Sequence, residues 1–128
     1  DEGGMAIFEA ESGAIASLHT TLTQWKNHFE FEVFGDEGYI KIEGLGSSYG
    51  VEKLIFGKRD FTAPFANKIT EYRRGDISWK EEWLEFTKAV KNNRQPLGNG
   101  VDGLATMRIA LTAYESEKIK KSLVIKNN

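Results

Sequence analysis

The spacing of the apolar residues changes between the two halves of this chain. In the first half, apolar and polar residues alternate, as they do in Phe29–Val33, and a period of two is typical of a half-buried β-strand. Short turns such as Gly35–Gly38 separate these runs, so consecutive strands should pair antiparallel. The expected strands lie near residues 5–10, 14–25, 28–33, 40–43, 51–57 and 68–73.

The second half of the chain has the period of a helix. From Ser78 onward, apolar residues recur every three or four positions, and Ser78 with Glu81 forms the pattern of a capping box. A second helix is expected to begin near Asn99, a favourable N-cap residue. The apolar stripe that this helix should bury consists of Val101, Leu104, Met107, Leu111 and Tyr114. Leu123–Ile125 is predicted to be a closing strand.

Strands that are followed by helices, without strict alternation, predict an α+β fold. We expect an open, mainly antiparallel β-sheet with the helices packed on one face. The length of 128 residues suits one domain, so residues 1–128 are expected to form a single domain. The chain opens on Asp1 and its first methionine is Met5, from which we expect a fragment of a longer protein.

Composition argues against several classes of protein. The net charge of −2 gives no electrostatic reason to expect nucleic acid as a partner. The sequence has no cysteine, which excludes disulfides and thiolate metal sites. No apolar run approaches the roughly 20 residues that span a membrane, so no membrane association is expected. The predicted location is cytoplasmic.

Neither the glycine-rich segment nor the histidines predict a catalytic or cofactor site. The dinucleotide fingerprint needs glycines at its first, third and sixth positions between a strand and a helix. In Gly44–Gly50 the sixth position is Tyr49 and a strand should follow, so we expect a structural loop. His19 and His28 lie on different expected strands without acidic residues at metal-site spacing, so no metal site is expected. A third hypothesis, a small hydrolase that uses His19, is disfavoured because no companion nucleophile is present. We predict no catalytic residue in this chain.

The residues best suited to a hydroxylated ligand are Trp25, Lys26 and Asn27. Together they offer stacking, positive charge and hydrogen bonding at the end of an expected strand, whereas the alternative is a hairpin with a partly buried indole. Tyr49, in the glycine-rich segment, is a further candidate. His19 lies on a polar strand face and is the last candidate, although a surface or interface histidine explains it more simply.

Eight segments carry a resemblance through their order and spacing, and together they cover nearly the whole chain. They are Ala6–Ala14, Trp25–Asn27, Phe34–Tyr39, Gly44–Gly50, Asp76–Trp79 with Glu82 and Phe86, Arg94–Pro96, Asp102–Gly103 and Ala113–Ser116. This order resembles the carboxy-terminal domain of the glucose–fructose oxidoreductase/inositol dehydrogenase/MocA (Gfo/Idh/MocA) family. Trp25–Asn27 and Gly44–Gly50 are similar to one subgroup of sugar dehydrogenases in that family.

The resemblance implies an amino-terminal Rossmann domain before this one and a whole protein that transfers hydride between NAD or NADP and a sugar, polyol or related substrate. In that family the catalytic lysine lies in a Glu-Lys-Pro motif of the first domain. Neither proline of this chain follows a lysine, so no catalytic residue is carried over. This chain is then expected to form a substrate-pocket wall and an oligomer interface, and to bind no cofactor by itself.

Self-association is expected through the sheet face, because a monomer seldom leaves a large apolar face exposed and symmetric pairing covers it. The alternative function is a freestanding, non-catalytic α+β module that recognises a carbohydrate or a protein, with Trp25 and Tyr49 as binding residues. A Rossmann half encoded upstream of Asp1 would separate these two hypotheses.

Overall fold

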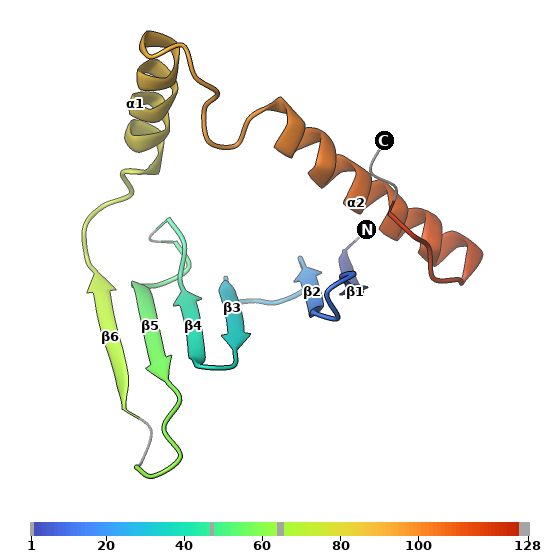
Figure 1. Cartoon of the computed structure of the whole chain (residues 1–128), viewed down its shortest axis with the longest axis horizontal. Helices are drawn as coiled ribbons and strands as arrows, with labels where there is room; N and C mark the ends of the chain where they lie inside the picture. Colours follow the sequence, from blue (N-terminus) through green and yellow to red (C-terminus); the bar gives the residue numbers. More distant parts are fainter. Residues whose placement is uncertain (1, 47, 64–65, 126–128) are drawn as a thin grey trace. The chain divides into compact units, whose positions relative to one another are not determined.

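The computed structural model describes residues 2–46, 48–63 and 66–125 and shows an α+β protein, which confirms the predicted fold class. Six strands and two helices lie in this part of the chain (Figure 1). They are β1 (Gly3–Glu9), β2 (Ile15–Thr21), β3 (Glu30–Gly35), β4 (Gly38–Glu43), β5 (Glu52–Lys58), β6 (Asn67–Tyr72), α1 (Ser78–Lys91) and α2 (Gly100–Ile119).

The chain divides into two compact units. The sheet unit consists of Thr23–Glu81 and contains β3 to β6 with the first residues of α1. The hairpin–helix unit consists of Asp1–Leu22 and Glu82–Asn128 and contains β1, β2, the rest of α1 and α2. The single domain and the covering of the sheet by the helices stay predictions.

The four strands of the sheet unit pair antiparallel, each with the next along the chain. The turn that joins β3 to β4 is Asp36–Glu37, between Gly35 and Gly38, which confirms the predicted hairpin turn. Gly38 cannot carry a side chain without rearrangement, because a Cβ at this position would overlap the carbonyl oxygen of Gly57 on β5. The two-residue turn fixes the register of the β3–β4 pair, and the register decides which residues share a face.

β1 and β2 form a separate antiparallel hairpin, so the strands make two sheets rather than the one open sheet expected. The second strand was expected to reach residue 25, but it ends at Thr21. Its partner strand begins at Gly3, and the N–H of Leu22 donates to the carbonyl oxygen of Glu2 (2.7 Å) at the very start of that strand. The chain after Leu22 therefore lies past the end of β1 and has no residue of that strand to pair with.

Asp76 caps the start of α1, in contrast to the predicted capping box at Ser78. The helix begins at Ser78, whose N–H donates to Oδ1 of Asp76 (2.9 Å). Hydrogen bonds from the hydroxyl and the N–H of Ser78 lower the pKa of the Asp76 carboxyl, because they stabilise its charged form. A carboxylate at this position also suits the positive end of the helix dipole.

A two-point ion pair fastens the end of α1 to the connection that follows it. Nη1 and Nη2 of Arg94 lie 2.6 and 2.7 Å from the two carboxylate oxygens of Glu85. The N–H of Leu97 also donates to Glu85 (3.1 Å), and the N–H of Arg94 donates to the carbonyl oxygen of Ala89 (3.0 Å). The hydrogen bonds from Arg94, followed by that from Leu97, lower the pKa of Glu85 to about 2.

α2 begins at the predicted cap. Oδ1 of Asn99 accepts hydrogen bonds from the N–H groups of Val101 (2.8 Å) and Asp102 (3.4 Å). The N–H of Asn99 donates in return to Oδ2 of Asp102 (3.0 Å), which completes a capping box. The helix ends at Lys120, which adopts the left-handed conformation with a φ of 55°.

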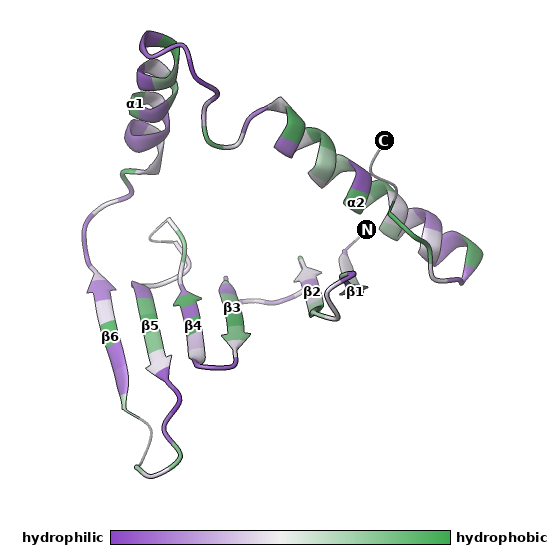
Figure 2. Ribbon diagram, in the orientation of Figure 1, coloured by the Kyte–Doolittle hydropathy of each residue, from purple (hydrophilic) through white to green (hydrophobic). Residues whose placement is uncertain are grey.

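Two predictions for the carboxy-terminal half are wrong. Leu123–Ile125 is irregular and pairs with neither sheet. The stripe of α2 that was expected to be buried is exposed, with 55% of Met107 and 61% of Leu111 accessible to solvent. Apolar residues are spread around α2 rather than gathered on one stripe, because Ala105, Ile109 and Ala113 lie between the stripe residues (Figure 2).

Both units leave most of their large apolar side chains exposed. Among the described residues, Ala89 is the one apolar residue that is fully buried. Exposed apolar surface of this extent marks regions that contact another part of a protein or another molecule. The uncovered faces are therefore the first places to look for function.

Candidate functional site

One face of the four-stranded sheet, hereafter the apolar face, carries apolar side chains from three adjacent strands. They are Phe31 and Val33 of β3, Ile40 and Ile42 of β4, and Leu54 and Phe56 of β5. Lys68 and Thr70 of β6 continue the same face. All of the six apolar residues except Leu54, which is half-buried, are exposed. The alternation along each strand and the register between strands bring them to one face.

A shallow hollow of about 230 Å³ lies on the apolar face. Its lining residues are Ile40, Leu54, Phe56, Lys68 and Thr70. Of these side chains only Lys68 and Thr70 are polar, whereas a sugar or polyol presents many hydroxyl groups that need partners. Ligand pockets also usually enclose roughly 300–1,000 Å³. The hollow therefore suits an apolar side chain of a packing partner better than a sugar.

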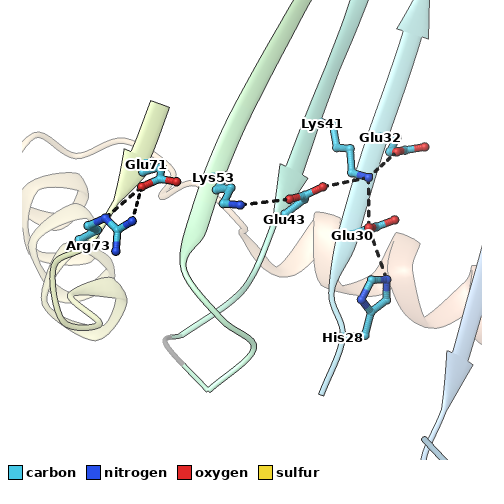
Figure 3. Close-up of polar contacts among 8 residues, drawn as sticks. All are labelled: His28, Glu30, Glu32, Lys41, Glu43, Lys53, Glu71 and Arg73. Atoms are coloured by element: carbon cyan, nitrogen blue, oxygen red, sulfur yellow. Dashed lines mark hydrogen bonds and ion pairs between the residues drawn. The ribbon is translucent and has the colours of Figure 1, made fainter. Parts of the chain in front are cut away.

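The opposite face of the sheet, hereafter the charged face, has Lys41 at the centre of three carboxylates (Figure 3). Nζ of Lys41 lies 3.1 Å from Glu30 and 3.2 Å from Glu32, both on β3. It also lies 3.0 Å from Glu43, two positions along β4 from Lys41 itself. One ammonium group thus joins two strands through three glutamates.

The three carboxylates raise the pKa of Lys41, with the hydrogen bond to Glu43 as the largest cause and those to Glu30 and Glu32 next. The ammonium therefore stays charged at neutral pH. A general base needs a pKa near the working pH, so Lys41 is unsuited to that role. Its side chain is 20% exposed, and the cluster is best interpreted as a brace across β3 and β4.

Further ion pairs continue the charged face across the sheet. Nζ of Lys53, on β5, lies 4.0 Å from Glu43, and the Arg73 guanidinium lies 2.7 Å from Glu71 at the end of β6 (Figure 3). Alternating signs on neighbouring strands stabilise their register, although each exposed pair by itself contributes little. The ion pairs brace the strands across this face, which also carries Ile55 opposite Ile69 on β5 and β6.

At the turn end of the charged face, two aromatic rings stack. The ring centroids of Phe34 and Tyr39 are 5.2 Å apart, with 17° between the ring planes. The Tyr39 ring covers Gly57, which is buried, and a Cβ on Gly57 would overlap this ring. The ring thereby fills the space above a glycine in the next strand, a common device in sheets.

The Gly44–Gly50 loop joins two antiparallel strands, as predicted for a structural loop. β5 follows it, so this loop has no helix N-terminus to hold a pyrophosphate. The N–H of Gly46 donates instead to the carboxylate of Glu52 (2.7 Å), and Gly44 has a φ of 80° that favours glycine. Ser47 lies outside the described residues. The loop does not fit a dinucleotide cofactor, and no step involving one is assigned to it.

Four of the five predicted binding residues lie in the sheet unit. Trp25, Lys26 and Asn27 are consecutive in the irregular segment between β2 and β3, and Tyr49 lies in the glycine-rich loop. Trp25 is 94% exposed, which contradicts the alternative of a partly buried indole. His19 lies on β2 opposite Met5 in the hairpin–helix unit. A binding role for these residues stays a prediction.

Sequence reasoning missed the role of Lys41. The alternation at Phe29–Val33 was interpreted only as a half-buried strand, without a partner for Glu30 and Glu32. The sequence did contain a signal for this cluster. A two-residue turn at Asp36–Glu37 places Glu32 opposite Lys41 on the neighbouring strand. Register counting across a predicted hairpin would have found the cluster.

The acidic and histidine side chains of the described residues form no metal cluster, and the helices are not membrane spans. Within residues 2–46, 48–63 and 66–125, no three side chains of His, Asp or Glu are grouped so that they could hold a metal ion. His28 has Glu30 as its ion-pair partner, with 3.5 Å between Nε2 and Oε1. Neither α1 nor α2, the helices of the described part, is long and apolar enough to cross a membrane.

Comparisons with protein-family models, with curated proteins and with solved structures each gave no match.

Proposed function

We propose that this chain is the carboxy-terminal domain of an NAD(P)-dependent oxidoreductase that acts on a sugar, a polyol or a related substrate. In this role it forms a wall of the substrate pocket and the interface between subunits. The proposal rests on the resemblance of the eight segments to the Gfo/Idh/MocA family. The observation that carries it is the antiparallel sheet with one extended apolar face left exposed.

The apolar face supports a role in assembly. Its residues come from three adjacent strands and form a continuous surface, and the hollow at Phe56 suits an apolar side chain. A second copy of the chain is the partner we propose, because a closed symmetric pair covers such a surface without leaving a further face free. In light scattering, a particle mass that stays that of a monomer across a wide concentration range would contradict this.

In the proposed enzyme, the cofactor, the preceding domain and this chain would have different roles. The cofactor would supply the hydride, and a lysine and a histidine of the preceding domain would transfer the proton. Within this chain, Trp25 offers a stacking surface, and Lys26 and Asn27 offer hydrogen bonds to hydroxyl groups. Lys41 on the charged face is unsuited to be a general base, because the surrounding carboxylates keep it protonated.

The first test is to sequence the coding DNA upstream of Asp1. The proposal expects about 150 further residues with a Gly-x-Gly-x-x-Gly turn after the first strand and a later Glu-Lys-Pro. The full-length protein is then assayed with NAD and NADP against a panel of sugars and polyols, by the absorbance of the reduced cofactor. A start codon immediately before Asp1 would overturn the proposal.

Trp25→Ala in the full-length enzyme then tests the substrate wall. We expect KM for the sugar to rise several-fold with kcat little changed, because a stacking surface serves substrate and transition state alike. Trp79→Ala, which removes another exposed tryptophan, is the matched control. An unchanged KM would remove Trp25 from the proposed pocket without affecting the assignment of the domain.

A second candidate function is a freestanding module that binds a carbohydrate or a protein. The exposure of Trp25 favours it, because a solvent-exposed indole is a common anchor in binding surfaces. Titration of the chain with oligosaccharides, followed by tryptophan fluorescence, tests this function directly. Binding that is lost in Trp25→Ala, together with a gene that begins at this domain, would favour the module over the oxidoreductase.

A further inference from the structure

The chain contains one Asn-Gly dipeptide, Asn99–Gly100, and it lies at the start of α2. In this pair of residues the backbone nitrogen of glycine can attack the side-chain amide of the preceding asparagine, because glycine has no Cβ to hinder the approach. Gly100 is exposed, and nothing lies within 4 Å of the position that a Cβ on it would take. The surroundings of Gly100 are therefore open to a rearrangement.

The capping hydrogen bonds hold the side-chain amide that would be attacked. Oδ1 of Asn99 accepts hydrogen bonds from the N–H groups of Val101 (2.8 Å) and Asp102 (3.4 Å). Gly100 occupies the first helical position, where an N–H has no acceptor within the helix. The backbone nitrogen of Gly100 and the side-chain amide of Asn99 are thus adjacent. Neither takes part in the backbone hydrogen bonds within the helix.

The same capping box holds the backbone away from the reactive geometry. Asn99 is extended, with a ψ of 178°, and its N–H is fixed to Oδ2 of Asp102 (3.0 Å). Closure of a five-membered ring requires the nitrogen of Gly100 to turn toward Cγ of Asn99, so the extended backbone must first be released. Opening of the first turn of α2 therefore has to precede the reaction.

We propose that Asn99 is a site of spontaneous deamidation whose rate is set by the opening of the α2 capping box. The Gly100 nitrogen gives its proton to water or hydroxide and forms a bond to Cγ of Asn99. The bond between Cγ and Nδ2 breaks, and ammonia leaves. Water then opens the cyclic imide to aspartate or isoaspartate, and isoaspartate inserts a methylene group into the main chain and disrupts the start of the helix.

The test holds the whole chain at mildly alkaline pH and follows the mass of the Asn99 peptide in proteolytic digests over time. The parent chain is compared with Asp102→Ala, which opens the box, and with Gly100→Ala, which blocks the attack. We expect Asp102→Ala to react about two- to fivefold faster than the parent, the factor that a weakened cap implies. The parent in urea should react faster still, and Gly100→Ala should react much more slowly.

Asn92, which precedes another asparagine, provides a reference in the same digests. Its rate should be equal in the parent and in Asp102→Ala, because the change is confined to the start of α2. A parallel acceleration at Asn92 would show general unfolding of the variant and would overturn the local assignment. Equal rates at Asn99 in the parent and in Asp102→Ala, or in the folded and the urea-unfolded parent, would also overturn it.

Discussion

The sheet unit pairs four strands edge to edge, whereas the hairpin–helix unit pairs only two and places its remaining elements in helices. In the sheet unit, each inner strand has a neighbour on both sides, and the charged face adds ion pairs between strands. In the hairpin–helix unit, the interactions that fix the elements are local, at the ends of the helices. A two-stranded hairpin alone is only marginally stable in water.

This comparison teaches where a substitution should have most effect. In the sheet unit a change at one position disturbs a ladder shared by several strands. In the hairpin–helix unit a change at a cap affects the end of one helix, and the rest of that helix is retained. We therefore expect larger losses of stability from the sheet than from the helix ends.

Gly38→Ala should have the largest effect. A Cβ at Gly38 would overlap the carbonyl oxygen of Gly57, and Gly57 is paired with both Tyr39 and Asn67, so its backbone cannot move aside without disturbing strand pairing. We expect a loss of about 3 kcal/mol in the free energy of unfolding, measured by urea denaturation with far-UV circular dichroism. Gly35→Ala is the matched control, because its Cβ would meet only an ordinary contact, and equal losses in the two variants would contradict the register of this turn.

Lys41→Met should have an intermediate effect. It leaves the carboxylates of Glu30, Glu32 and Glu43 facing one another without their shared cation. The midpoint of urea unfolding should fall at low salt and recover partly at high salt, because salt screens the repulsion. Lys53→Met, which removes a cation 4.0 Å from one carboxylate, should have a smaller effect.

The pH dependence of the Lys41 contribution has a defined sign. The pKa of Lys41 is raised above its ordinary value of 10.5, so the stabilisation is fully present below 10.5 and is lost as the pH rises through the folded-state value. Between neutral pH and pH 10, the difference between the parent and Lys41→Met should therefore stay constant. A difference that disappears within that window would show that the carboxylates do not hold the ammonium.

Glu85→Gln should have the smallest effect of the three and should sharpen the contrast between the units. The pKa of Glu85 falls from its ordinary 4.5 to about 2 in the folded chain. Its stabilisation is therefore fully present above pH 4.5 and is lost as the pH falls toward 2. The difference in thermal unfolding midpoint between the parent and Glu85→Gln should be present at pH 7 and vanish near pH 2.

Glu117→Gln is the control for this experiment, because its ion pair with Lys120 lies within one helix and is largely exposed. It should change the unfolding midpoint little at any pH. A difference for Glu85→Gln that persists unchanged at pH 2 would mean that Arg94 does not act through the charge of Glu85.

Local patterns were enough to find most elements of both units. The alternation at Phe29–Val33, the turn at Asp36–Glu37 and the cap at Asn99 each involve residues a few positions apart, and the structure has a strand, a turn and a cap there. Ser78 was expected to cap this helix but is its first residue, and the N–H of Ser78 donates to Asp76. The candidate binding residues could be chosen by chemical type, but their chemistry does not fix what they bind.

What the sequence by itself determined is the α+β class, the antiparallel hairpins and the positions of the helices, since these depend on periodicity and turn residues. Only the tertiary structure decided that β2 ends at Thr21, that the strands divide into two sheets, and that Leu123–Ile125 joins neither. It also decided that Lys41 gathers three carboxylates. The physical reason is that strand ends, sheet membership and ion-pair clusters depend on partners distant in sequence. A pattern of neighbouring residues does not indicate which distant residues those partners are.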